Sequence, residues 1–283
     1  MTIHEAQQQL LFQLYHIYDD REAQSIAGWV MEHLTGWEKI DRILNKNVKL
    51  SLPKQEELKE ITEQLLQHKP VHYILHQAWF QGMKLYVDEN VLIPRPETEE
   101  LVEWAASEFS GKTILDVGTG SGCIPIALKK KFPHASVSAC DISEGALKVA
   151  ARNASEQNTP IELIQIDFLD KEERNKLPVF DVIVSNPPYI AVSEKSEIDK
   201  HVVEYEPHTA LFVPNEDSLV FYEALADFGQ THLSGFMMME IHYLKGQEVK
   251  QLFEQKGYTV ELRKDMHGND RMIKATAPRS YQP

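Results

Sequence analysis

The stretch Ile114-Leu115-Asp116-Val117-Gly118-Thr119-Gly120-Ser121-Gly122 decides the fold. Its first four residues are mostly apolar, and with Thr113 they predict a buried strand. Glycine then recurs at every second position, and the apolar pattern over residues 124–131 predicts a helix. Glycines allow the backbone to approach a ligand closely, and the helix N-terminus that follows offers free N–H donors. The stretch therefore predicts a nucleotide-like ligand at the end of the first strand of an α/β sheet.

Strand and helix patterns alternate from Lys112 onward, which predicts a doubly wound α/β fold with a parallel sheet and right-handed crossovers. The expected strands span residues 113–117, 136–140, 161–166, 180–184, 236–241, 258–263 and 271–277. The expected helices span residues 124–131, 146–153, 219–228 and 246–255.

The first 75 residues carry only helical patterns, for example Leu10, Leu14 and Ile17 on one face. Two further apolar sets repeat this spacing: Ile26, Val30 and Leu34, and then Leu58, Ile61 and Leu65. A shorter helix is expected over residues 38–44. Two short strands around Gly82 predict a hairpin. We therefore expect a helical module for recognition of a macromolecule (residues 1–75), a β-hairpin linker (76–92) and the α/β domain (93–283).

A second informative stretch, Ser185-Asn186-Pro187-Pro188-Tyr189, follows the strand expected over residues 180–184. The strand would deliver Asn186 to its carboxyl end, where open α/β sheets bind ligands. The two prolines lack N–H donors, so the loop is stiff and rich in acceptors. An Asn oxygen and a backbone carbonyl can together accept both N–H bonds of a planar amino group, with Tyr189 against its face. The alternative is an ordinary Asn-Pro turn with Tyr189 as packing.

The glycine pattern disfavours NAD and ATP as the ligand. A dinucleotide fingerprint would need Gly where Cys123 stands, and the Lys-Ser/Thr of a phosphate-binding loop is absent. Asp141 ends the second strand, where a carboxylate can accept bonds from ribose hydroxyls. After the third strand, Phe168 could cover an adenine and Asp167 could accept its amine. A helix-cap role for Asp141, a core role for Phe168 and turn roles for Asp167 and Asp116 are the alternatives.

The composition indicates which classes of partner to expect: nucleic acid, membrane or metal. The formal net charge is −14 and no Lys/Arg cluster is visible, so a bare nucleic-acid substrate is not expected. No signal peptide and no stretch of 18 apolar residues appear, so a membrane is not expected either. Cys123 and Cys140 are expected to be free buried thiols in a reducing compartment, which predicts a cytoplasmic location and no metal site.

These motifs together resemble a class I S-adenosyl-L-methionine-dependent methyltransferase acting on nitrogen. Three further stretches narrow the resemblance to the HemK/PrmC family of peptide chain release factor glutamine N-methyltransferases: Ile93-Pro94-Arg95-Pro96-Glu97-Thr98-Glu99, Tyr205-Glu206-Pro207-His208-Thr209-Ala210-Leu211 and Asp265-Met266-His267-Gly268-Asn269-Asp270-Arg271. His76 and His242 depart from the family, which commonly has Gly at both positions.

The resemblance implies a seven-stranded Rossmann-like sheet and the cofactor S-adenosyl-L-methionine. The implied cofactor-binding residues are Asp116, Gly118, Thr119, Gly120, Ser121, Gly122, Asp141, Ile142, Asp167, Phe168 and Asn186. The implied substrate is the Gln of a Gly-Gly-Gln loop in release factors, bound by Asn186, Pro187, Pro188 and Tyr189. Asn186, Pro187 and Tyr189 are the expected catalytic residues, in a protein expected to act as a monomer.

Two other functions use the same residues. An enzyme that methylates adenine or guanine amino groups in nucleic acid would stack a flipped base on Tyr189. A cofactor-binding adaptor without catalysis would need only the glycine-rich loop and its carboxylates. The helical N-terminal module and the acidic charge favour the protein substrate over the nucleic acid.

Overall fold

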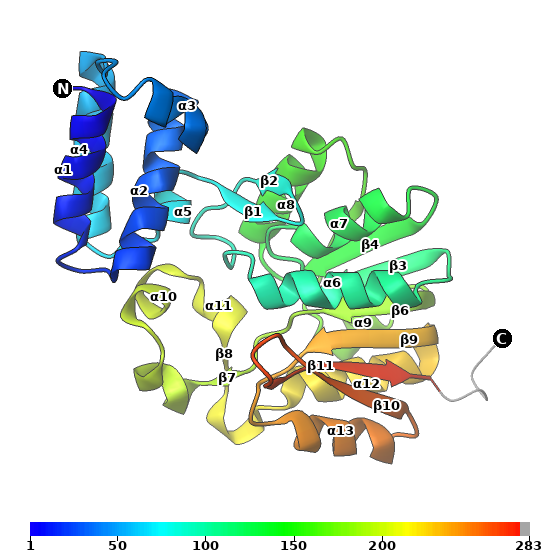
Figure 1. Ribbon diagram of the computed structural model, residues 1–283. Coiled ribbons are helices and arrows are strands. Elements are labelled where there is room, and N and C mark those ends of the chain that lie inside the picture. Colours follow the sequence, from blue (N-terminus) through cyan, green and yellow to red (C-terminus); the bar gives the residue numbers. More distant parts are fainter. Residues whose placement is uncertain (278–283) are drawn as a thin grey trace. The chain divides into compact units, whose positions relative to one another are not determined.

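The computed structural model describes residues 1–277, apart from the side chains of residues 200 and 216. The chain divides into two compact units, residues 1–77 and residues 78–283 (Figure 1). The last six residues of the α/β domain expected from the sequence lie outside the described residues.

The first unit is helical, with α1 (Ile3–Leu14), α2 (Asp20–Thr35), α3 (Lys39–Leu44), α4 (Leu52–Leu66) and α5 (Val71–Ile74). Local signals set the ends of these helices. Thr2 and Glu5 form a capping box at the start of α1, and Asp19 caps α2, which ends at the left-handed Gly36. The buried faces of α1, α2 and α4 form one hydrophobic core, as the apolar spacing predicts.

Two details of this unit differ from a simple pattern. The prediction that Ile17 shares the helical face of Leu10 and Leu14 is wrong, because α1 ends at Leu14 and Ile17 lies in the turn that follows. His76 has a φ of 50°. This left-handed conformation suits glycine best, which accounts for the glycine that the resembled family commonly carries there.

The second unit is built on a seven-stranded sheet in the order β10-β11-β9-β6-β3-β4-β5 (Figure 1). Its strands are β3 (Thr113–Val117), β4 (Ser136–Asp141), β5 (Glu162–Gln165), β6 (Phe180–Ser185), β9 (Leu233–Glu240), β10 (Thr259–Lys264) and β11 (Asp270–Thr276). All seven expected strands are present. The chain runs outward from β3 through β4 to β5 and then returns to β6 on the other side of β3. The carboxyl ends of β3 and β6 therefore meet at a topological switch point.

The expectation of an all-parallel sheet is wrong for one strand. β11 pairs antiparallel with both β10 and β9, whereas β9, β6, β3, β4 and β5 are parallel. The connection between Lys264 and Asp270 is short, and a short connection can only return the chain as a hairpin. No crossover helix is encoded there, so the reversal was visible in the spacing.

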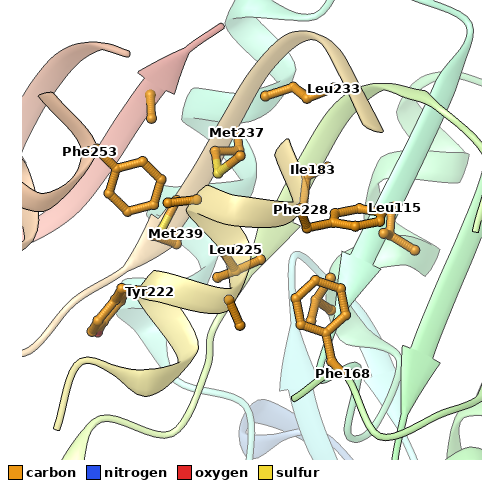
Figure 2. Close-up of a cluster of buried hydrophobic side chains, with 14 of the residues drawn as sticks. Leu115, Phe168, Ile183, Tyr222, Leu225, Phe228, Leu233, Met237, Met239 and Phe253 are labelled. Carbon is orange, nitrogen blue, oxygen red and sulfur yellow. The ribbon is translucent and has the colours of Figure 1, made fainter. Parts of the chain in front are cut away.

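Helices cover both faces of the sheet, because alternate side chains along each strand point to opposite sides. Ile114, Val182 and Val184 face a core formed with α6 (Pro96–Glu108), α7 (Cys123–Lys131) and the hairpin β1 (Ala78–Phe80) and β2 (Met83–Leu85). The opposite face packs on α12 (Val220–His232) and α13 (Gly246–Gln255); Figure 2 shows Leu115, Ile183 and Met237 among the aromatic rings of this second core. Two further helices complete the layers, α8 (Glu144–Glu156) and α9 (Lys171–Arg174).

Residues 186–219, here called the crossover segment, connect β6 to α12. The sequence patterns did not resolve its short elements, which are β7 (Ile190–Ala191), η1 (Val192–Glu197), α10 (Lys200–Tyr205), α11 (His208–Leu211), β8 (Phe212–Val213) and η2 (Asn215–Asp217). β7 and β8 pair in parallel. Glu206 in this segment is buried and accepts hydrogen bonds from Arg95 Nη2 at 2.6 Å and from the Ile93 N–H at 3.3 Å. The segment is thereby tied to the entry of α6.

None of the helices within residues 1–277 combines the length and the apolar character that a membrane span requires.

Candidate active site

A cavity of about 330 Å³ lies where the carboxyl ends of β3, β4 and β6 meet. Its size falls in the range of small-molecule sites, and its lining is mostly apolar with a few polar groups. Ten of the residues predicted for the site line it: Gly118, Thr119, Gly120, Ser121, Asp141, Ile142, Asp167, Phe168, Asn186 and Pro188. Asp116, Gly122, Pro187 and Tyr189 are not part of the lining. The sequence prediction thus brings residues from four successive strand ends to one place.

The glycine loop after β3 needs its glycines for backbone reasons. Gly118, Gly120 and Gly122 all have positive φ, at 75°, 51° and 79°. A Cβ at Gly122 would also lie 3.1 Å from Cβ of Ala150 in α8. The N–H groups of Gly118 and Thr119 both donate to the carbonyl of Cys140 at the end of β4. The loop therefore follows the sheet edge closely and keeps its backbone against the cavity.

Asn153 holds the other end of this loop. The residue is completely buried, and its Nδ2 donates to the carbonyls of Ser121 and Tyr86, at 2.8 and 2.9 Å. Its Oδ1 accepts the N–H of Tyr86 at 2.7 Å. One side chain on α8 thus fixes the glycine loop and the chain after the hairpin together. Nothing in the sequence signals this role, because an Asn within a helical pattern is ordinary.

Asp116 is the most unusual group of the site. Its side chain is fully buried at the end of β3, and neither carboxylate oxygen has a hydrogen-bond partner among the residues that the structure describes. Burial raises the pKa of Asp116 to about 7, and the nearby charge of Asp141 adds to the effect. The hydroxyl of Thr119 is likewise buried, with no hydrogen-bond partner within the described part of the chain. Buried polar atoms are normally satisfied, so two unsatisfied groups beside one cavity indicate a polar or cationic ligand.

Asp141 ends β4 with its carboxylate directed to the glycine loop. Oδ2 accepts the N–H of Gly120 and Oδ1 accepts the N–H of Ser143, each at 2.9 Å. Burial raises the pKa of Asp141, although these hydrogen bonds oppose the rise. The adjacent Ile142 lines the cavity with a side chain that is 55% exposed. Asp141 therefore combines a structural role at the loop with a place in the cavity wall.

Phe168 follows β5 and is both a core residue and a wall of the cavity. Its ring lies edge-on to Phe228 of α12, with centroids 5.3 Å apart (Figure 2). Oδ1 of Asp167 accepts the N–H of Leu169 at 2.9 Å, while the Asp167 N–H donates to Glu173. The alternatives weighed for these residues, core for Phe168 and turn former for Asp167, thus describe real contacts that coexist with the cavity.

Asn186 directly follows β6 at the cavity, and its Nδ2 donates to Oγ1 of Thr98 at 3.1 Å. Pro188 also lines the cavity, whereas Pro187 is buried and is not part of the lining. Tyr189 packs at the margin of the core, edge-on to His242 at 5.9 Å. Burial raises the pKa of Tyr189 to about 12, so its phenol stays protonated at neutral pH.

His242, where the resembled family commonly has Gly, fastens the crossover segment. The Leu244 N–H donates to Nδ1, so Nε2 carries the proton and donates to Oε2 of Glu194 at 3.1 Å. Burial lowers the pKa of His242, which keeps the ring neutral, and the ring stacks on Tyr243. The departure from the family therefore adds a contact next to Tyr189 and leaves the cavity lining unchanged.

The sequence prediction missed two parts of the lining. One part lies before and at the start of α6 and includes Leu92, Pro94, Arg95 and Thr98. The other lies in the crossover segment and just after it, and includes Thr209, Phe212, Val213 and Phe221. The signal was present, since the stretches over residues 93–99 and 205–211 carry the family resemblance. No chemical role was assigned to them because neither stretch follows a predicted strand.

The residues present fit S-adenosyl-L-methionine. The two unsatisfied groups, Asp116 and Thr119, suit a cationic ligand with an ammonium group, and the loop of positive-φ glycines leaves room for close approach. Asp141 and Phe168 line the cavity, and would offer a ribose an acceptor and an adenine an apolar face. Within residues 1–277, no group of three His, Cys, Asp or Glu side chains is arranged to hold a metal ion.

Comparison with known proteins agrees with this arrangement. Residues 97–208 match the family profile of the Methyltransferase small domain, and residues 5–75 match that of the PrmC N-terminal domain. The release factor glutamine methyltransferase of Flavobacterium psychrophilum is 42% identical over 97% of this chain and 99% of its own length. The release factor glutamine methyltransferase of Lactococcus lactis is 46% identical over 76% of this chain and 80% of its own.

Among solved structures, the hMettl16 catalytic domain in complex with the MAT2A 3′UTR hairpin 6 has a TM-score of 0.54 at 16% identity. The match covers 83% of this chain and 85% of the hMettl16 chain. At this identity, the likeness supports the methyltransferase fold alone. The family follows from the sequence relatives, of which the Flavobacterium psychrophilum protein matches over 97% of this chain. The protein uses S-adenosyl-L-methionine as methyl donor, and the chain belongs to the release factor glutamine methyltransferase family.

Proposed function

We propose that this protein transfers a methyl group from S-adenosyl-L-methionine to the side-chain amide nitrogen of a Gln in peptide chain release factors, within their Gly-Gly-Gln loop. The observation that carries the proposal is that Asn186 lines the same cavity as the glycine loop, Asp141 and Phe168. A group that can hold a planar amide thus stands beside the cofactor pocket. The names of the relatives supply the substrate.

The cofactor would be held by the residues predicted for it. Asp116 and Thr119 would face its cationic part, Asp141 would accept from the ribose, and Phe168 with Ile142 would cover the adenine. Asp167 would accept from the adenine amine, and the remaining loop residues Gly118, Gly120, Ser121 and Gly122 would supply backbone contacts. When bound, S-adenosyl-L-methionine supplies a methyl group activated by a neighbouring positive charge.

The chain supplies position and hydrogen bonding. An amide nitrogen is a weak nucleophile because its lone pair is delocalised into the carbonyl. Asn186 Oδ1 and the Pro187 carbonyl would accept the two N–H bonds of the substrate amide, orient its nitrogen and favour positive charge on it. Pro188 would wall the pocket and exclude water, with Tyr189 packed against His242 at the margin of the core. No general base is needed, since the nitrogen becomes strongly acidic once alkylated, and the protonated Tyr189 is no base at neutral pH.

The helical module over residues 1–75 would recognise the folded release factor, joined by residues 76–92 to the methyltransferase domain over residues 93–283. The net charge of −14 disfavours a phosphate backbone as the partner, so we infer a protein substrate with no direct nucleic-acid contact. A monomer in the cytoplasm is sufficient for this reaction.

Incubation with labelled cofactor tests the proposal against its alternatives. Release factor, DNA and ribosomal RNA are offered separately, together with a release factor whose loop Gln is replaced by Ala. We expect label on the intact release factor alone. Label on nucleic acid would establish a base methyltransferase instead. Cofactor binding without label on any of the substrates would establish a non-catalytic adaptor.

A further inference from the structure

A chain of hydrogen bonds runs from the end of β9 to the end of β6 through the first turn of α6. Thr98 Oγ1 donates to Oε2 of Glu240 at 2.8 Å, and Asn186 Nδ2 donates to Thr98 Oγ1 at 3.1 Å. Thr98 is 2% exposed and Glu240 is 1% exposed. The mechanism proposed above uses neither residue. Burial of a carboxylate is unfavourable unless the group is paired and hydrogen-bonded, so the position of Glu240 calls for an explanation.

The direction of this chain follows from counting protons. An ionised carboxylate only accepts, and a Thr hydroxyl has a single proton to give. Because Thr98 gives that proton to Glu240, it can offer Asn186 only a lone pair, and only the Nδ2 end of the amide can use one. The orientation of the Asn186 amide, which electron density alone often leaves ambiguous, is thereby set by its neighbours.

We propose that Thr98 and Glu240 are positioning residues that hold the Asn186 amide with its oxygen toward the cavity. The inference rests on the proposed function. A substrate amide presents two N–H donors, so it needs an acceptor there. A reversed Asn186 would present donors to donors and repel it. The same orientation disfavours a substrate carboxylate, whose oxygens would face the Asn186 oxygen.

The charge of Glu240 sustains the direction of the chain. A protonated Glu240 could donate to Thr98, which could then donate to the Asn186 oxygen and reverse the amide. Burial raises the pKa of Glu240 to about 7. Six charged or titratable groups act on Glu240. They are Glu97 in α6 and Arg95 directly before it, Arg271 in β11, Cys123 in α7, Tyr222 in α12 and Tyr189 in the loop after β6. Methyl transfer is expected to weaken as the pH falls below about 7.

Thr98→Val and Thr98→Ser form a matched pair of variants. Valine has the shape of threonine without the hydroxyl, and serine keeps the hydroxyl. Single-turnover methyl transfer to intact release factor is measured with saturating cofactor. Loss of a residue that orients a functional group typically lowers activity about 10- to 100-fold, so we expect that loss for Thr98→Val and near wild-type transfer for Thr98→Ser. Equal rates for Thr98→Val and wild type would overturn the proposal.

Two further readouts separate positioning from a structural role. If Thr98 acts through Asn186, adding Thr98→Val to Asn186→Ala should reduce the rate little further. Fully multiplicative losses would contradict this. Glu240→Gln should remove the decline in rate below about pH 7, because its amide does not titrate; an unchanged pH profile would speak against the role of Glu240.

The Asn186 amide itself gives a readout that needs no activity. Its side-chain ¹⁵N–¹H signals are assigned by their disappearance in Asn186→Ala. Their chemical shifts should change in Thr98→Val and stay close to those of wild type in Thr98→Ser. Unchanged shifts in Thr98→Val would contradict the proposed chain of hydrogen bonds. If the wild-type protein methylates no release factor, the proposed function fails, while this spectrum still decides whether the chain exists.

Discussion

The N–H of Gly120 donates a 2.9 Å hydrogen bond to Oδ2 of Asp141, so the carboxylate at the end of β4 braces the loop that follows β3. The second carboxylate oxygen is also engaged, by the N–H of Ser143 at the start of α8. Each carboxylate oxygen can accept more than one hydrogen bond, so the brace is compatible with a ligand in the cavity. Asp141 thus connects the shape of the loop to the wall of the cavity.

Asp141→Ala should therefore weaken S-adenosyl-L-methionine binding on two counts, through the lost acceptor and through the loosened loop. Loss of hydrogen bonds to a charged group is worth roughly 1–3 kcal/mol, or about 5- to 150-fold in affinity. Calorimetry measures the affinity. Asp170→Ala is the control, since Asp170 also accepts two backbone N–H groups, at α9, but does not line the cavity. Equal affinities for Asp141→Ala and the control would remove Asp141 from the site.

Asp116 predicts an unusual dependence of stability on pH. Its pKa is raised from 3.8 to about 7 by burial, so the unfolded chain releases the proton before the folded chain does. The contribution of Asp116 to the free energy of unfolding is then greatest below about pH 4, falls as the pH rises to about 7, and is constant above that. At 1.36 kcal/mol per pH unit, the upper bound on this loss is about 4 kcal/mol.

Asp116→Asn removes that titration, so the variant should gain stability relative to wild type as the pH rises from 5 to 8. Urea unfolding without cofactor measures the difference. Asp181→Asn is the control: hydrogen bonds from Lys112 and Thr113 overcome burial and lower the pKa of Asp181, so the stability difference of this variant from wild type should stay constant from pH 5 to 8. The affinity of Asp116→Asn for the cofactor should fall, since the substitution removes a buried negative charge that would attract the cationic ligand. A stability difference that does not vary with pH would show that Asp116 keeps its ordinary pKa.

Much of the site was predictable because its residues follow predicted strands. Asp141, Phe168 and Asn186 are far apart in the chain, but parallel strands end at one edge of the sheet, so the strand pattern alone brings them together. Their residue types then indicate the chemistry.

Thr98 and Glu240 were not predictable in this way. Their contact joins residues 142 positions apart, and it depends on how α6 packs over β9. Phe212 and Val213 line the cavity from β8, a two-residue strand that is too short to show a period. Tertiary packing, which no local pattern records, places these residues at the site.

Removal of the helical unit should separate cofactor binding from recognition of the protein substrate. The two units have their own hydrophobic cores, so a chain truncated to residues 78–283 is expected to bind cofactor as the full chain does. Its methyl transfer to intact release factor should be much slower, because the lost contacts supply remote binding energy. A short peptide that carries the loop Gln is the control and should react equally with both chains. Equal turnover of the intact factor would refute the recognition role.

Asn186→Ala tests the pocket for the substrate amide. The substitution removes one acceptor and leaves the glycine loop, Asp141 and Phe168 in place, so cofactor affinity should change little. Removal of one preorganised polar contact of this kind typically costs about 10²–10³ in rate. Asn175→Ala, at an exposed asparagine after α9, is the control and should react as wild type does. Single-turnover transfer at saturating cofactor measures both.

Asn186→Asp is the sharper variant, because it keeps the size and the acceptor oxygens but loses the N–H donor. Thr98 would then lie between two carboxylates with one proton to give, since Glu240 already takes it. Unpaired carboxylates at this depth repel each other, and the new side chain should turn away from Thr98. We therefore expect Asn186→Asp to transfer methyl no faster than Asn186→Ala at neutral pH, even though it can still accept from the substrate. A rate near wild type would mean that an acceptor oxygen at position 186 is sufficient and that its partner Thr98 is not needed.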